Sequence, residues 1–187
     1  MRKLFIFCPL FFGLLFFSCT RDETTVQIIH NPLMTFSLNG TSIWKADTYS
    51  FAPVSQVVVY PKDTLLAGQL YYRFTMQGTG KDNVGNSYQL IITFDATDVN
   101  QLIGSYSPFY TSQMGLSQVQ LFNLTHSNNL SAYNLCQDSL ASAVFQVQNQ
   151  SQAESLISGI FQITLCNTRD TALRISITNG IFNNIKY

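Results

Sequence analysis

Charged side chains are scarce in this sequence. Asp, Glu, Lys and Arg make up 11% of its 187 residues, and 10 basic residues balance 10 acidic ones. In an average soluble domain, by contrast, about a quarter of the residues are charged. A nucleic-acid-binding surface needs a clustered basic face, so the composition argues against that class of partner. Ser, Thr, Asn and Gln fill the polar positions instead, which is typical of extracellular β-proteins.

Histidine is scarcer still, because His30 and His126 are the only two in the chain. The chain therefore has few histidines from which to build a Ser-His-Asp triad or a His-based zinc site. There is no G-x-S-x-G motif, and Gly78-Thr79-Gly80-Lys81 lacks the spacing of a phosphate-binding loop. We accordingly predict no catalytic residue, no metal site and no cofactor.

Two carboxylates allow more than one interpretation. Asp95 and Asp98 stand at the end of a predicted strand, where Asp commonly caps a turn, and turn capping is the favoured interpretation. The alternatives are the acid–base pair of a glycan hydrolase and a pair of calcium ligands. The segment Asp82-Asn83-Val84-Gly85-Asn86 lacks the alternating ligands of a calcium loop, so it is predicted to be a turn.

Long apolar runs are missing except at the N-terminus. After Met1-Arg2-Lys3, residues 4–17 are almost all apolar. This run is shorter than the roughly 20 residues of a membrane-spanning helix, and it predicts a signal peptide over residues 1–18. Ser18-Cys19 resembles the lipobox of bacterial lipoproteins, in which the cysteine thiol carries a diacylglycerol. We therefore predict lipidation at Cys19, with an ordinary secretory signal as the alternative.

Residues 19–33 are predicted to be a lipidated tether, and residues 34–187 a single domain. The predicted partner is the membrane, because each buried CH₂ of an acyl chain contributes about 0.8 kcal/mol. Thr20, where Asp would signal retention, resembles lipoproteins sent to the outer membrane. Arg21-Asp22-Glu23 resembles an acidic surface-export tag, or is simply a solvated part of the tether. Periplasmic and surface-exposed locations both stay open.

Cysteine is limited to four residues. Cys8 would leave with the signal peptide and Cys19 would be used by the lipid. Cys136 and Cys166 remain, and an even pair in an oxidising compartment predicts a disulfide worth roughly 3 kcal/mol. Two buried free thiols are the alternative.

The rest of the chain shows the alternation of β-strands. In residues 70–77 the even-numbered side chains are predicted to face the core, and the odd-numbered ones, including Tyr71 and Arg73, to face outward. Asn39-Gly40 predicts a type I′ hairpin, and Asn179-Gly180 is predicted to separate two strands. About ten such segments without an amphipathic helix predict an all-β protein, an antiparallel β-sandwich or a partly closed β-barrel.

Several short motifs resemble those of one family. Phe36-Ser37-Leu38-Asn39-Gly40 with Trp44-Lys45-Ala46 resembles the opening of small Bacteroidota lipoproteins of unknown function. Gly104-Ser105-Tyr106 and Ser158-Gly159-Ile160-Phe161 are similar to segments in the middle of those chains, and residues 177–187 to their ending. Ile160 stands where that family usually has Thr. The resemblance implies a shared β-fold and an outer-membrane location, and it assigns no catalytic residue.

Aromatic residues supply the candidate contact surface. Tyr71 shares the predicted outer face with Arg73, while Tyr106 and Tyr110 lie near a predicted loop. Rings beside polar groups are typical of surfaces that bind a glycan or a peptide. The alternative is that these rings cover the sheet and stiffen the loops.

Three tripeptides resemble the D-[S/T]-apolar acceptor motif of Bacteroidota protein O-glycosylation. They predict glycans at some of Thr64, Ser139 and Thr171, each in a turn or loop where a surface modification fits.

These observations predict a lipid-anchored β-domain of the cell envelope, a binding or structural module whose further partner is a glycan or another envelope protein. The alternatives are a glycan-directed hydrolase and a carrier of a small apolar ligand.

Overall fold

The computed structural model describes residues 33–59, 68–109, 113–125, 131–136 and 142–187. The predicted signal peptide, Cys19 and nearly all of the tether lie outside these ranges. So do His30, His126, Thr64, Tyr110 and Ser139. Within the described ranges, no helix is long and apolar enough to span a membrane.

All regular structure in the described residues is β-strand, which confirms the predicted fold class. The strands are β1 (Leu33–Leu38), β2 (Ser42–Val59), β3 (Gln69–Asp82), β4 (Ser87–Ala96), β5 (Gly104–Tyr106), β6 (Met114–Asn123), β7 (Ser131–Leu135), β8 (Ala143–Ser151), β9 (Leu156–Asn167) and β10 (Arg174–Lys186). Every neighbouring pair is antiparallel.

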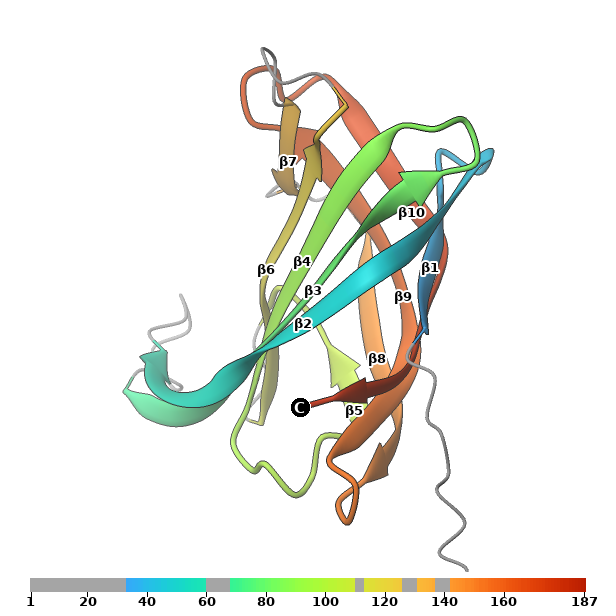
Figure 1. The fold of residues 1–187 in the computed structure, drawn as a ribbon. Coiled ribbons are helices and arrows are strands. Elements are labelled where there is room, and N and C mark those ends of the chain that lie inside the picture. Colours follow the sequence, from blue (N-terminus) through green and yellow to red (C-terminus); the bar gives the residue numbers. More distant parts are fainter. Residues whose placement is uncertain (1–32, 60–67, 110–112, 126–130, 137–141) are drawn as a thin grey trace, which may run out of the picture.

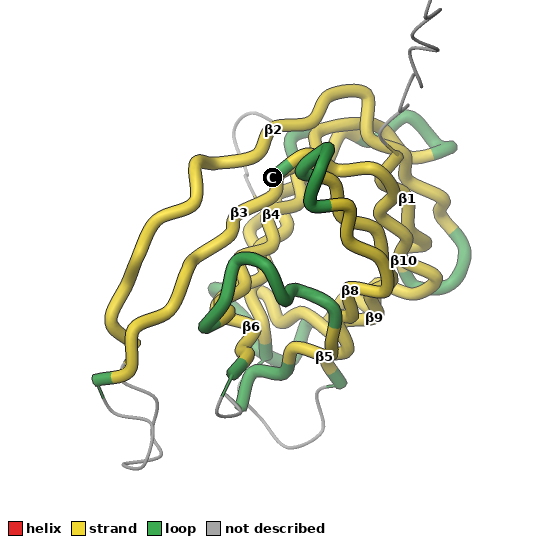
Figure 2. The backbone as a smooth tube through the Cα atoms, turned by 90° about the horizontal axis from the view of Figure 1, so that it is seen from below, coloured by secondary structure: helices red, strands yellow, loops and turns green. Residues whose placement is uncertain are grey.

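The sheet closes on itself, so the structure has the barrel and not the sandwich. The strand order β10-β1-β2-β3-β4-β6-β7-β9 returns to β10 through the β10–β9 pairing (Figures 1 and 2). On the edge of β9 that faces away from β10, β7 pairs with residues 165–167 and β8 with residues 156–163. β5 pairs with the other edge of β8. The Leu116 amide of β6 donates to the Ser107 carbonyl, just after β5, at 2.8 Å, which links β5 to β6. The wall is therefore shared by β7 at one end and by β8 and β5 at the other.

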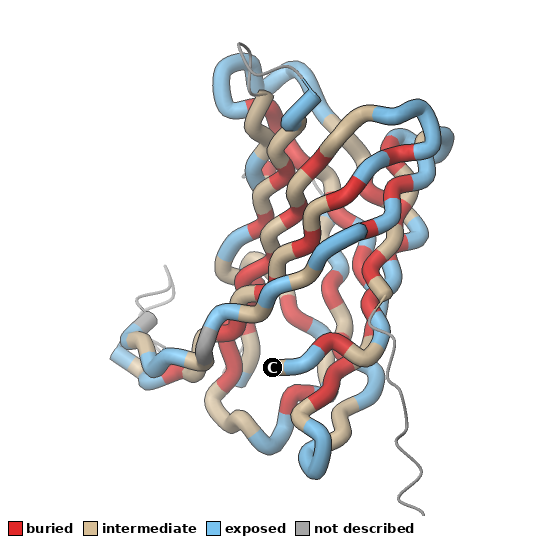
Figure 3. The backbone as a smooth tube through the Cα atoms, viewed as in Figure 1, coloured by how far each residue is buried: buried red, intermediate tan, exposed pale blue. Residues whose placement is uncertain are grey.

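Aromatic rings fill the centre of the barrel. Phe74 stacks on Phe94 with ring centroids 5.1 Å apart, Phe94 packs on Phe145 at 4.9 Å, and Phe145 stacks on Phe182 at 5.2 Å. These four rings come from β3, β4, β8 and β10, so the row crosses the barrel from one wall to the other. Buried positions alternate along the strands around them (Figure 3).

Two glycine–phenylalanine pairs join β9 to β10 reciprocally. Gly159 lies opposite Phe182, and Gly180 lies opposite Phe161. A Cβ at Gly159 would come within 2.5 Å of the Phe182 ring, and a Cβ at Gly180 within 2.5 Å of the Phe161 ring. Each ring therefore occupies the space that a side chain on the opposite strand would need. Ile160 and Ile181, paired between them, are partly exposed on the outside.

The predicted break at Asn179-Gly180 is wrong. β10 runs through this dipeptide without a turn, and the pairing with β9 shifts register between Ile177 and Gly180. Asn179 has a φ of 51°, so the left-handed conformation that would make a hairpin turn here makes a bulge. Asn39 and Gly40, by contrast, have φ of 49° and 73° and form the predicted turn.

The predicted alternation in β3 holds only for part of the strand. Phe74 and Met76 are buried as predicted, but Leu70 is 49% exposed and Tyr71 is fully buried. The cause is that β2 and β3 continue past the end of the barrel as a two-stranded arm (Figure 1). Leu70 lies on that arm beside exposed Val58, where its side of the sheet no longer faces the core.

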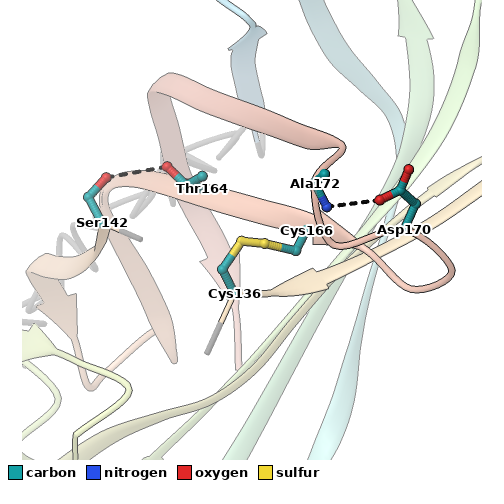
Figure 4. The surroundings of a disulfide bond; sticks show 6 residues. All are labelled: Cys136, Ser142, Thr164, Cys166, Asp170 and Ala172. Atoms are coloured by element: carbon teal, nitrogen blue, oxygen red, sulfur yellow. Dashed lines mark hydrogen bonds between the residues drawn. A yellow bond between two sulfur atoms is a disulfide. The ribbon is translucent and has the colours of Figure 1, made fainter. Parts of the chain in front are cut away.

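The disulfide between Cys136 and Cys166 is present, as predicted (Figure 4). The two Cα atoms are 5.1 Å apart and the sequence separation is 30 residues. Cys136 directly follows β7, and Cys166 is paired with Asn134 of that strand. The bond thus reinforces a strand pairing of only three residue pairs, Tyr133–Asn167, Asn134–Cys166 and Leu135–Leu165.

We predict that Gly159→Ala and Gly180→Ala each lower the free energy of unfolding by about 1–3 kcal/mol, because the added methyl group collides with a packed ring and with backbone. Urea denaturation measures the change. Gln162→Ala, at an exposed position of β9, is the control and should change it by less than about 0.5 kcal/mol. Equal, small effects of all three substitutions would contradict this account of the β9–β10 pairing.

Candidate functional site

A groove opens in the barrel wall next to Leu33, the first described residue of β1. β1 pairs with β2 only between Thr35 and Leu38, and Leu33 at its start lies opposite Asn183 of β10. Beyond this point no described strand separates the remainder of β2 from the end of β10. The groove encloses about 640 Å³. Ten residues line it: Tyr49, Ser50, Phe51 and Ala52 of β2, Glu154 and Leu156 around the β8–β9 turn, and Asn184, Ile185, Lys186 and Tyr187 at the end of β10.

The wall of the groove is mainly apolar and joins the aromatic core. Phe51 and Tyr187 lie 6.5 Å apart by ring centroids, and Tyr187 packs edge-on against Phe74 at 6.0 Å. The exposed residues Glu154 and Lys186 bring one charge of each sign to the groove lining. The groove can thus take an apolar molecule and place polar groups near its opening.

Hydrogen bonds within the protein hold the two tyrosine hydroxyl groups at the groove. The Tyr49 hydroxyl accepts from the Met34 amide at 2.9 Å and donates to the Ala46 carbonyl at 3.4 Å. The Tyr187 hydroxyl accepts from Nε2 of Gln150 at 2.7 Å. Both hydroxyl groups are thus hydrogen-bonded within the protein. A ligand in the groove would contact mainly the ring carbons of these two side chains.

Gln150 also fixes the loop between β4 and β5. Its Nε2 donates to the Val99 carbonyl at 3.0 Å, and its Oε1 accepts from the Leu102 amide at 2.9 Å. This one side chain therefore connects the loop across the end of the barrel to Tyr187. The sequence carried no signal for this role, because a glutamine near a turn is ordinarily read as a surface residue.

Arg73 lies on the outer face of β3, as predicted, and forms an ion pair with Asp95. Its Nε and Nη2 each donate to one carboxylate oxygen of Asp95 at 2.8 Å, and Nη2 also donates to Oγ of Ser117 at 2.9 Å. The Asp95 side chain is fully buried and that of Arg73 is 34% exposed. Such a bidentate pair fixes β3, β4 and β6 relative to one another.

Tyr71 and Tyr106 are not surface residues, contrary to their prediction as ligand contacts. Burial, and then the negative charge of Asp95, raise the pKa of Tyr71. The Tyr106 ring packs edge-on against Phe94 and Phe145, and its hydroxyl donates to the Leu102 carbonyl at 2.7 Å. Burial raises the pKa of Tyr106 far above its usual value. Both rings are therefore parts of the packed structure and offer no exposed face.

The carboxylates proposed for catalysis or calcium do not form a common site. Asp95 is bound to Arg73, whereas Oδ1 of Asp98 accepts from the Asn100 amide at 2.8 Å and caps a turn. No group of three or more His, Cys, Asp or Glu residues in the described part of the chain is arranged to hold a metal ion. Turn capping, the favoured interpretation, is what the structure has at Asp98.

Asp82 likewise organises the turn between β3 and β4, as predicted. Its Oδ1 accepts from the amides of Val84 and Asn86 at 3.0 and 2.8 Å. Burial by itself would raise the pKa of Asp82, but hydrogen bonds from Asn86, Val84 and Gly85 outweigh it and hold that pKa below the usual value.

Thr171, one of the three predicted glycosylation sites, is exposed in the turn between β9 and β10. The neighbouring Asp170 carboxylate accepts from the Ala172 amide at 3.0 Å (Figure 4). An exposed hydroxyl on a fixed turn is accessible to a modifying enzyme, and glycosylation here stays a prediction.

Comparisons of the chain with family models, with curated proteins and with solved structures gave no match. The resemblance to small Bacteroidota lipoproteins thus stays a prediction that rests on the short motifs alone.

We predict that Arg73→Met lowers the free energy of unfolding by about 2 kcal/mol, because it leaves the Asp95 carboxylate buried without its cation. The value is below the roughly 3–5 kcal/mol of a fully buried pair, since water reaches one-third of Arg73. Adding Asp95→Asn should recover part of this loss. Arg169→Met, at an exposed position, is the matched control, and urea denaturation of the four proteins checks the prediction. An equal effect at Arg73 and Arg169 would contradict it.

Proposed function

We propose that this protein is a lipid-anchored module of a bacterial cell envelope that binds an apolar or amphipathic small molecule in the groove between β2 and the end of β10. Cys19 carries the anchor, and the barrel presents the groove.

The groove is the observation that carries the binding proposal. Its volume of about 640 Å³ lies inside the roughly 300–1,000 Å³ that small-molecule sites occupy. An eight-stranded barrel has room for side chains or for one small ligand, and aromatic rings already fill the centre here. A ligand is therefore accommodated at the open seam, against Phe51 and Tyr187, with the charges of Glu154 and Lys186 near its polar end.

The arrangement gives less support to the alternative of a glycan hydrolase. Such an enzyme uses two carboxyl groups on either side of a cleft. Asp95 is buried in its pair with Arg73 and Asp98 caps a turn, and neither lines the groove.

The anchor is tested by Cys19→Ala in cells that process lipoproteins. We expect the protein to move from the membrane pellet to the soluble fraction and its intact mass to lose the acyl chains. Cys8→Ala, inside the predicted signal peptide, is the matched control and should leave the protein on the membrane. A Cys19→Ala protein that stays in the pellet with unchanged mass would contradict the anchor.

The groove is tested with a fluorescent fatty acid added to the full chain carrying Cys19→Ser, so that no attached acyl chain competes. We expect saturable binding that Ala52→Glu weakens more than tenfold, because it puts a charged side chain on the lining of the groove, beside its apolar wall. Ala172→Glu, exposed in the β9–β10 turn, is the control with the same change of side chain. Thermal melts should show that both variants stay folded.

Two results would contradict the binding proposal. One is the absence of saturable binding to the unsubstituted groove. The other is equal binding by the Ala52→Glu and Ala172→Glu proteins.

A further inference from the structure

One edge of β2 has no partner strand over most of its length in the described residues. β2 pairs with β1 only from Ser42 to Lys45, and from Thr48 to Val59 it pairs with β3 alone. An open edge presents a row of unpaired amide and carbonyl groups and can accept one more strand. Between Thr48 and Val59 it carries no charged side chain. Pro53 and the register shift between Ala52 and Ser55 interrupt the edge, so the stretch open to pairing is Thr48 to Ala52.

The chain that precedes β1 arrives at this edge in the right direction. β1 is antiparallel to β2, with Phe36 opposite Trp44 and Thr35 opposite Lys45. Pairing with β2 ends at Thr35, and Met34 and Leu33 pair with β10, but the Met34 amide still reaches the Tyr49 hydroxyl of β2 at 2.9 Å. A chain that continued from Leu33 in this direction would pass Tyr49 and Phe51, which line the groove.

The sequence of residues 26–31 suits an added strand. Val26-Gln27-Ile28-Ile29-His30-Asn31 is rich in β-branched residues and contains no acidic residue, lysine or arginine. It is the apolar part of a segment whose other members, Thr20 to Thr25, are charged or polar. A purely solvated tether has no need of three large aliphatic side chains. Six residues in extended conformation span about 20 Å, enough to follow β2 along the groove.

We propose that residues 26–31 dock in cis on the open edge of β2 as an extra strand, and that their aliphatic side chains cover the groove. Backbone hydrogen bonds to the β2 edge provide the affinity, and the apolar groove provides the selectivity for isoleucine and valine. The inference rests on the edge, the groove and the place where the preceding chain joins β1, and it does not depend on the proposed ligand. If a ligand binds as proposed, the added strand and the ligand compete for the groove.

Hydrogen exchange of the full chain tests this proposal. The segment is altered by Ile28→Asp with Ile29→Asp, which puts one charge against the apolar wall whichever face of the strand turns toward the groove. We expect those amides of β2 between Tyr49 and Ala52 that point away from β3 to be protected in the unaltered protein and to exchange at least tenfold faster in this variant, while the amides bonded to β3 stay protected in both. Thr24→Asp with Thr25→Asp adds the same charge just outside the segment and should leave the protection unchanged.

Cysteine cross-linking supplies an independent readout of position. Gln27→Cys, Ile28→Cys and Ile29→Cys are each combined with Ala52→Cys in the full chain carrying Cys19→Ser. At least one pair is expected to form an intramolecular disulfide under mild oxidation. Fast exchange of the Tyr49–Ala52 amides that point away from β3 in all proteins, together with no cross-link, would overturn the proposal.

Two other outcomes would assign the groove to a different occupant and also overturn it. Protection that disappears on dilution would mean that a second copy of the chain pairs with the edge. Protection that survives Ile28→Asp with Ile29→Asp but is lost after extraction with organic solvent would mean that a bound lipid covers the groove. The fatty-acid experiment stays separate: tighter probe binding by the Ile28→Asp, Ile29→Asp protein supports competition. If the probe binds no variant, the proposed ligand is contradicted, and the hydrogen-exchange result alone decides whether residues 26–31 form the added strand.

Discussion

The reciprocal packing of Phe161 and Phe182 over the opposing Gly180 and Gly159 is the contact on which the barrel depends. β9 is the strand at which the ring closes, since β10 pairs with one of its edges, and β7 and β8 divide the other between them. The absence of two side chains leaves room for two rings next to the glycine backbone, and one of these rings, Phe182, continues the aromatic row across the interior. Core volume and strand register are thus set by the same four residues.

The sequence predicted local features better than the shape that they combine to make. The inward direction of Phe74 and Met76, the Asn39-Gly40 turn and the Cys136–Cys166 pair depend on neighbouring residues or on simple counting, and all are present. Asn179-Gly180 has the same two letters as Asn39-Gly40, yet it forms a bulge because β1 and β9 pair with β10 along both sides. That difference depends on strands distant in the sequence, and no local pattern encodes it.

The candidate site was still harder to predict. Tyr71 and Tyr106 are residue types that often contact ligands, but both are buried, and the Tyr106 ring packs against Phe94 and Phe145. The groove lies beside the part of β2 that the described residues of β1 leave uncovered, and the extent of pairing between two strands cannot be read from periodicity. Gln150 was missed for a similar reason, because its three partners come from two distant parts of the chain, the β4–β5 loop and Tyr187 after β10.

The Cys136–Cys166 bond also constrains the order in which the wall can assemble. β8 lies inside the 30-residue loop that the bond closes, and β7 and β8 pair with the same edge of β9. The β8–β9 hairpin is local and can form early, whereas the pairing of β7 with β9 must close the whole loop for three residue pairs. In the oxidised chain the disulfide has already closed this loop, so the pairing of β7 with β9 costs little further loop-closure entropy. The reduced chain must lose this loop-closure entropy during folding. Reduction therefore slows the pairing of β7 with β9 more than the formation of the β8–β9 hairpin.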